Sequence, residues 1–180
     1  MRYKPTLVLF FLVLSSCIVK KKTTYGTDRT VTVEQGTEAQ TAKPPKKEKK
    51  RKNRKADNIV ASAMRYTGTR YRFGGTTKKG MDCSGLVYVS LKENAIPFPR
   101  VSYQMAGKGQ RVRLKEVRKG DLLFFKTSKS GKRINHVGLV VQVKGDQVKF
   151  IHATSSRGVI VSSLKEGFWN KAFVKATRIL

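Results

Sequence analysis

Met81-Asp82-Cys83-Ser84-Gly85 is the stretch that decides the interpretation of this chain, because it follows a Gly-containing loop and opens an apolar run. Asp82 is a good helix N-cap, so we expect a helix that begins at Cys83 and ends near Asn94. The partial positive charge at a helix N-terminus favours a thiolate at Cys83, and the free N–H groups there can bind the oxyanion that forms when a carbonyl is attacked. The alternative is a small cysteine that packs in the core.

The chain offers one candidate for each remaining role in cysteine catalysis. A cysteine nucleophile needs an imidazole to take its proton and a third group to orient that imidazole. The sequence contains only two histidines, His136 and His152, and both lie in strand-like segments after the cysteine. The alternative for each is a hydrogen-bonded histidine at a strand edge without a catalytic role.

The register of one hairpin decides whether the two imidazoles meet. With the two-residue loop Gly145-Asp146 and no irregularity, His152 would pair with Leu139, and the two rings would point to opposite faces. With an odd-length loop, His152 pairs with Gly138, which leaves room for its ring, and both imidazoles lie on one face within reach of each other. We therefore predict an odd-length loop or a bulge in this hairpin.

The first 16 residues are predicted to be a lipoprotein signal peptide. A short positive region precedes an apolar stretch, 6–14, that is too short to cross a bilayer as a helix. Leu14-Ser15-Ser16-Cys17 resembles a bacterial lipobox, in which the cysteine is lipidated and becomes the mature N-terminus. The alternative is an ordinary cleavable signal peptide with a chance cysteine. If Cys17 is lipidated, Cys83 has no disulfide partner, and a lone thiol in an exported protein is worth keeping mainly if it does chemistry.

Residues 17–55 are predicted to be a lipidated N-terminus and a disordered basic tether. Residues 43–55 carry nine basic side chains and one acid, which favours a self-repelling coil. Such a tether would hold the domain above a membrane, or its charges could lie on anionic lipids. Ile18 is not the Asp that retains some lipoproteins at the inner membrane, so we expect a cell-envelope protein on the outer membrane, facing the periplasm.

The charge balance narrows the class of partner. Lys and Arg number 39 and Asp and Glu 11, which gives a net charge of +28. Nucleic acid is the usual partner of so basic a chain, but the export signal argues against it. Anionic lipid head groups and the carboxylates of cell-wall peptides are better candidates. A general basic bias of the proteome is the alternative explanation.

Residues 56–180 are predicted to form one α+β domain, large enough to bury a core without disulfides. Helices are expected first, with Asp57 capping the earliest, and short strands follow, an order that favours N-terminal helices packed on an antiparallel sheet of five to six strands. A short helix is expected at 163–171, and the expected strands are 111–114, 121–125, 134–143, 148–153, 158–161 and 173–179.

Several of these motifs resemble the NlpC family of papain-like cell-wall cysteine peptidases. The resemblance covers essentially all of residues 57–180 and departs from the family pattern at Val101. The segments that carry it are Tyr71-Arg72-Phe73-Gly74-Gly75, Asp82-Cys83-Ser84-Gly85, Pro99-Arg100-Val101-Ser102, Gly120-Asp121-Leu122, His136-Val137-Gly138 and His152.

The resemblance implies a papain-like fold and a role for each motif residue. Cys83 would attack a peptide carbonyl, His136 would act as general base and then acid, and His152 would orient His136. Tyr71 would help the Cys83 N–H to bind the oxyanion, and the reaction would pass through a thioester. No cofactor is implied, and no metal site is expected, because there is no His-x-x-x-His pair and no second nearby cysteine.

The implied substrate is peptidoglycan, and the implied state is a monomer. Two bonds stay open: the D-alanyl–diaminopimelate cross-link and the γ-D-glutamyl–diaminopimelate bond within a stem. Arg100 and Arg157 are candidates to pair with substrate carboxylates, and Ser84 and Ser102 are further candidate substrate-binding residues. The alternatives to this hydrolase are an acyl transferase acting on lipids and a non-catalytic wall-binding module.

Overall fold

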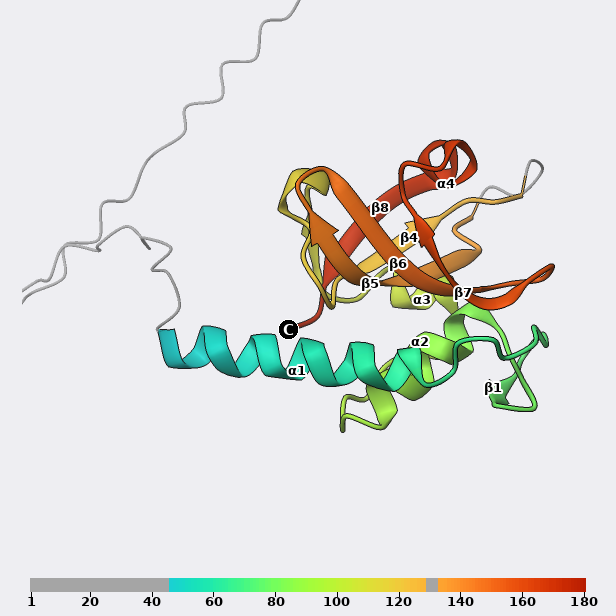
Figure 1. Cartoon of the computed structure of the whole chain (residues 1–180), viewed down its shortest axis with the longest axis horizontal. Coiled ribbons are helices and arrows are strands. Elements are labelled where there is room, and N and C mark those ends of the chain that lie inside the picture. The colour runs from blue at the N-terminus through green and yellow to red at the C-terminus, as the bar shows by residue number, and fades with distance from the viewer. Residues whose placement is uncertain (1–45, 129–132) are drawn as a thin grey trace, which may run out of the picture. The chain divides into compact units, whose positions relative to one another are not determined.

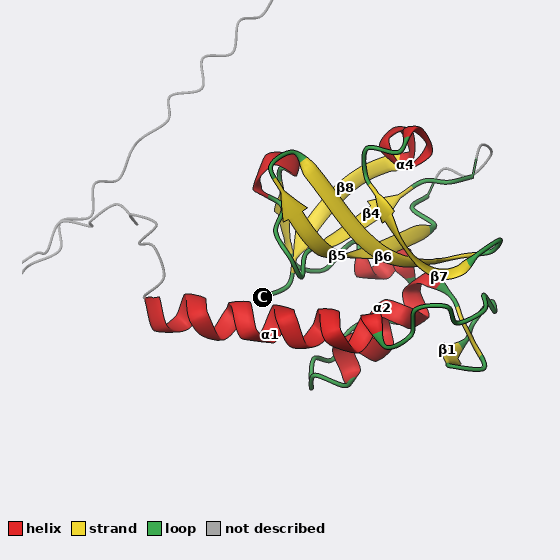
Figure 2. Cartoon of the chain, viewed as in Figure 1, coloured by secondary structure: helices red, strands yellow, loops and turns green. Residues whose placement is uncertain are grey.

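The computed structural model describes residues 46–128 and 133–180 (Figure 1). The predicted signal peptide, Cys17 and the tether up to residue 45 lie outside the described residues. The described part combines helices with a six-stranded antiparallel sheet (Figure 2), which confirms the expected α+β class. Within it, no helix has both the length and the apolar character that a membrane span needs.

The first helix, α1, spans Lys46–Met64 and begins earlier than expected. The prediction of a disordered tether through residue 55 was therefore wrong for residues 46–55, and Asp57 lies inside the helix instead of capping it. Lys and Arg are good helix formers, and adding turns to an existing helix costs much less than nucleating one. The packed half, with Ile59 and Ala63 fully buried, supplies that existing helix.

A second helix, α2, spans Cys83–Lys92 and begins at the predicted residue. Asp82 caps it, because its Oδ1 accepts a hydrogen bond from the Gly85 N–H at 2.6 Å. A short two-stranded sheet, β1 at Thr76–Thr77 and β2 at Gly80–Met81, leads into this cap. A short helix, α3 at Ser102–Met105, follows α2.

The main sheet has the strand order β3-β8-β4-β5-β6-β7, and all its pairs are antiparallel. A 3₁₀ turn, η1 at Leu114–Glu116, stands where the first expected strand ended, and the short helix α4 at Gly167–Ala172 precedes the last strand. The strands are β3 Gln110–Val112, β4 Leu122–Phe125, β5 His136–Lys144, β6 Gln147–Thr154, β7 Gly158–Ser163 and β8 Phe173–Arg178.

The sheet has an apolar cluster on each face, because successive side chains of a strand point to opposite sides. Leu139 and Ile151 belong to the cluster packed against α1 and α2. Val140 and Phe150 belong to the other, which includes Trp169 of α4. Figure 1 shows α1 and α2 below the sheet and α4 above it.

A bulge interrupts the pairing of β5 with β6. Val140 pairs with Phe150, and the next pair is Gln142 with Lys149, so Val141 is the extra residue. An extra residue shifts the register by one and moves all later side chains to the other face of the sheet.

This bulge brings the two histidines to one face. The turn is the two-residue loop Gly145-Asp146, which without a bulge would place His152 opposite Leu139. Continuing the observed register past Leu139 and Ile151 places His152 opposite Gly138, on the same face as His136. The bulge that we predicted is confirmed, whereas the alternative of an odd-length loop was wrong.

Gly138 tests how tightly this region is packed. A Cβ at Gly138 would lie 2.4 Å from Cδ2 of Phe150, so Phe150, and not the His152 ring as expected, fills the space that the glycine leaves. We expect Gly138→Ala to lower the free energy of unfolding by about 1–3 kcal/mol, the usual cost of overpacking. Urea denaturation measures this cost. Gly167→Ala is the control, since a Cβ there meets nothing within 4 Å. Equal stabilities of the two variants would contradict the packing.

Candidate active site

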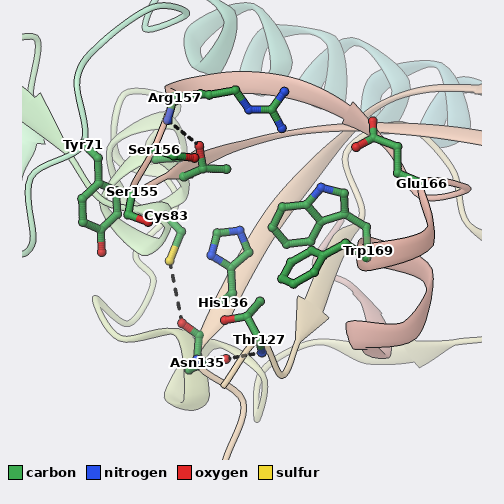
Figure 3. A pocket seen from close by; sticks show the side chains of 13 residues that line it. Tyr71, Cys83, Thr127, Asn135, His136, Ser155, Ser156, Arg157, Glu166 and Trp169 are labelled. Atoms are coloured by element: carbon green, nitrogen blue, oxygen red, sulfur yellow. Dashed lines mark hydrogen bonds between the residues drawn. The ribbon is translucent and has the colours of Figure 1, made fainter. Parts of the chain in front are cut away.

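A pocket of about 510 Å³ opens at the start of α2 and β5 (Figure 3). We call it the site pocket. It brings together Tyr71, Cys83, His136 and Arg157 from the sequence prediction. The full lining is Tyr71, Cys83, Thr127, Asn135, His136, Ala153, Thr154, Ser155, Ser156, Arg157, Glu166, Phe168 and Trp169.

Cys83 lies in the first turn of α2 and is 7% exposed. Its Sγ is 4.0 Å from the backbone oxygen of Asn135, and the ring of His136 lies beside it in Figure 3. Burial raises the pKa of the Cys83 thiol, and Asp82 adds to the rise, although the N–H groups of Val137, Ser84 and Cys83 itself act in the opposite direction. The N–H groups at the helix N-terminus thus act in the expected direction, toward a thiolate, but desolvation outweighs them and the pKa of the thiol is raised.

His136 and His152 form a hydrogen-bonded pair. Nε2 of His136 lies 2.9 Å from Nδ1 of His152. With its proton on Nε2, His136 donates to His152 and keeps the lone pair of Nδ1 for the thiol. Each ring's orientation is therefore fixed by the other.

The pair is buried, and burial sets its charge. Burial lowers the pKa of His136 to about 4. Burial, followed by the charges of His136 and Arg157, lowers the pKa of His152 to about 3. Both imidazoles are consequently neutral at pH 7, the form that can accept a proton.

The Trp169 ring packs against both imidazoles. It stacks on His136 with a centroid distance of 5.1 Å and an interplanar angle of 24°. It meets His152 edge to face at 4.4 Å, and Phe150 covers His152 at 4.7 Å. Nε2 of His152 is buried and has no hydrogen-bond partner among the described residues.

Asp82 and Arg100 hold the turn that presents Cys83. The Arg100 guanidinium bonds both Asp82 oxygens at 2.9 Å, the Ser84 hydroxyl at 2.7 Å and the Gly75 carbonyl at 3.2 Å. Burial works to raise the pKa of Asp82, but the hydrogen bonds from Arg100 and the N–H groups of Gly85 and Gly74 outweigh it and lower that pKa. Asp82 is therefore a buried carboxylate, held ionised by its partners.

The predicted substrate-binding residues separate into two groups. Arg157 lines the site pocket, whereas Arg100, Ser84 and Ser102 do not. Arg100 and Ser84 are engaged with Asp82, and Ser102 is a buried residue at the start of α3. The structure thus argues against a direct substrate role for these three, because their polar groups are used inside the protein or buried away from the pocket.

Tyr71 lies on the opposite side of the Cys83 sulfur from His136 (Figure 3). Burial raises the pKa of its hydroxyl, followed by the effects of Cys83 and Asp82. A hydroxyl that stays protonated is a hydrogen-bond donor at neutral pH. This placement suits the oxyanion role that the family resemblance implied.

Sequence reasoning missed several lining residues, above all Asn135, Glu166 and Trp169. Trp169 is the only tryptophan of the chain and falls in the predicted short helix at 163–171, a signal that could have marked it. Asn135 directly precedes His136 and contributes its backbone oxygen, which sequence patterns do not reveal. Among the described residues, no three His, Cys, Asp or Glu side chains gather as a metal site requires.

The profile of the NlpC/P60 family matches residues 68–178. The chain belongs to the NlpC/P60 family. It is 40% identical over 116 residues to "Murein DD-endopeptidase MepS/Murein LD-carboxypeptidase" of Escherichia coli, covering 64% of this chain and 58% of that protein. It is 42% identical over 115 residues to "Probable endopeptidase NlpC" of the same species, covering 63% of this chain and 71% of that one.

A solved NlpC/P60 structure shares the fold. The crystal structure of an NlpC/P60 family protein from Bacillus cereus superposes with a TM-score of 0.62 at 27% identity, over 68% of this chain and 39% of that one. The NlpC/P60 region is therefore established, and the chain spans less than two thirds of MepS.

The Arg100 network yields a test that separates a structural role from substrate binding. We expect Arg100→Ala to lower the free energy of unfolding by about 2–4 kcal/mol, because it leaves the buried Asp82 carboxylate with one partner fewer. Arg157→Ala removes a guanidinium whose residue is exposed and should change stability by less than about 0.5 kcal/mol. Urea denaturation of both variants at pH 7 measures the difference, and equal stabilities would refute the structural role of Arg100.

Proposed function

We propose that this protein is a cysteine endopeptidase that hydrolyses the D-alanyl–diaminopimelate cross-links of peptidoglycan. The observation that carries the proposal is that Cys83 and His136 line one pocket, with His136 held by a 2.9 Å contact to the buried His152. The similarity to MepS, which is named a murein DD-endopeptidase, supports this bond over the γ-D-glutamyl one.

The first step joins nucleophilic attack to proton transfer. The thiol has a raised pKa and the imidazole a lowered one, so a resting thiolate–imidazolium pair is disfavoured. As Sγ of Cys83 forms its bond to the scissile carbonyl carbon, the thiol proton passes to Nδ1 of His136. His152 then accepts a hydrogen bond from the resulting imidazolium through Nδ1 and stabilises it.

The tetrahedral intermediate places a negative charge on the former carbonyl oxygen. The backbone N–H of Cys83, in the first turn of α2, and the hydroxyl of Tyr71 are the donors proposed to bind it. When the C–N bond breaks, His136 returns its proton to the departing amine and a thioester remains on Cys83. Water, deprotonated by His136, then hydrolyses the thioester and restores the thiol.

Arg157 is proposed to bind a carboxylate of the peptide substrate. It lines the site pocket, and its guanidinium lies on the pocket wall in Figure 3. Both candidate substrates carry several carboxylates, and a guanidinium binds a carboxylate with two parallel hydrogen bonds. Within this proposal, lipidation at Cys17 places the domain in the cell envelope at the outer membrane, facing the periplasm.

Digestion of purified muropeptides tests the proposal. Residues 18–180 and the Cys83→Ala variant would be incubated with cross-linked dimers and with uncross-linked monomers, and the products identified by mass. We expect the protein with Cys83, and not the Cys83→Ala variant, to convert the dimers to intact tetrapeptide monomers. We also expect this activity to persist at pH 5, because the pKa of His136 near 4 keeps the imidazole a base there.

Other products would change the assignment. Cleavage of monomers between D-glutamate and diaminopimelate would replace the cross-link with the stem bond. If neither substrate is cleaved while residues 18–180 and the Cys83→Ala variant both still bind the sacculus, catalysis is contradicted and a wall-binding module is favoured.

A further inference from the structure

The N-terminal ten residues of α1 form a basic helical segment that the proposed reaction does not use. Residues 46–55 contain eight Lys or Arg side chains and one acid, Glu48, which pairs with Lys52 at 3.2 Å. Their side chains are exposed or half-buried, and α1 first buries a residue at Ala56. We call residues 46–55 the basic extension.

In the helical basic extension, cationic side chains repel one another. Lys46 lies one turn from Lys50 and Lys47 one turn from Arg51, and like charges at this spacing destabilise an isolated helix. Lys50 and Arg54 repeat the pattern. A ligand that supplies negative charge along about 15 Å of helix, the length of ten residues, would remove this repulsion.

An apolar groove lies between α1, the loop after η1 and the strands β5, β6 and β7. The groove has a volume of about 860 Å³. Its described lining contains no acidic side chain. The lining consists of Val60, Met64, Val117, Arg118, Lys119, Val141, Gln142, Val143, Lys149 and Val161.

The groove exposes apolar surface between cations. Met64 is 41% exposed, and Val143 and Val161 are each 37% exposed. Lys119 lies on the rim and is ion-paired with Asp57 of α1 at 2.7 Å, which ties the groove to the helix. Apolar side chains flanked by Lys and Arg are the pattern of proteins that rest on the interface of an acidic bilayer.

We propose that the basic extension and this groove together form a docking surface for an anionic phospholipid bilayer. The exposed valines and Met64 would enter the head-group boundary, and the cations would contact acidic head groups. Nucleic acid fits less well, because neither the basic extension nor the described groove lining offers an aromatic ring on which bases could stack.

The position of this surface suits a membrane-bound hydrolase. In Figure 1 the N-terminal end of α1 lies at the opposite end of the described domain from β1, which leads through β2 into Cys83. Docking by the basic extension would therefore hold the domain by the end away from β1.

Vesicle binding by the full chain tests the proposal. The probes are vesicles of phosphatidylcholine alone and of phosphatidylcholine with phosphatidylglycerol. Each cation near an acidic bilayer multiplies affinity by roughly fivefold, so we expect substitution of Lys46, Lys47, Lys49 and Lys50 by Gln to weaken binding to acidic vesicles by up to roughly 600-fold, the product of four such factors. Gln preserves helix propensity, so the helix itself is not the variable.

A matched variant removes the same charge elsewhere. Lys78, Lys79, Lys108 and Lys171 are exposed and lie outside the surface, and their substitution by Gln should change binding by less than about twofold, since distant exposed charges are screened. For the groove, Val143→Glu with Val161→Glu should weaken binding, whereas Val174→Glu, at a 44% exposed position outside the groove, should not.

Three results would overturn the proposal. The first is equal binding of the wild type and the first Gln variant to acidic vesicles. The second is equal binding of the wild type to both kinds of vesicle, which would assign the interaction to an apolar segment shared by all variants. The third is loss of duplex-DNA binding in the Gln variant while vesicle binding persists, which would make nucleic acid the ligand.

Discussion

The extra residue at Val141 in β5 is the constraint on which the candidate site depends. A strand has a period of two, so the regular hairpin with its Gly145-Asp146 turn would direct His136 and His152 to opposite faces. The bulge moves His152 onto the face of His136 and allows the 2.9 Å contact between the rings. Phe150, which fills the space at Gly138, and Trp169, which covers both rings, then bury His152 fully and leave His136 only 8% exposed, at the wall of the site pocket. Register, packing and the neutral state of the imidazoles are therefore consequences of one local irregularity.

The thiol is placed by a second, independent set of contacts. The buried carboxylate of Asp82 caps α2 and is held ionised by Arg100 across 18 residues of sequence, so Cys83 enters the site at a fixed angle. The first turn of α2 and the first residue of β5 both line the site pocket, which explains why Cys83 and His136 meet there. Burial disfavours charge on both Cys83 and His136, because it raises the pKa of the thiol and lowers the pKa of the imidazole. Proton transfer is then coupled to the attack on substrate instead of preceding it.

The sequence predicted the parts of the site that depend on local pattern. The Asp82 cap, the start of α2 and the need for a register shift between the histidines follow from capping chemistry and the period of a strand. Contacts between distant segments were harder to predict: Arg100 was assigned to substrate because nothing in its neighbourhood indicates that Asp82 and Ser84 use its guanidinium. Trp169 was missed for the same reason, since α4 meets the histidines only in three dimensions. The first ten residues of α1 were predicted to be disordered because a run of like charges taken by itself indicates a coil. The prediction did not consider that this run continues directly into a packed helix.

The most direct test of this account is the titration of His136 and His152 by imidazole NMR between pH 3 and pH 8, with the amide spectrum as the control for folding. We expect both rings to stay neutral through pH 5, with His136 changing charge near pH 4 and His152 near pH 3. We also expect Nε2 of His136 to carry the proton at neutral pH. Titration of either ring near its ordinary value of about 6.5 in the folded protein would contradict a buried, mutually oriented pair.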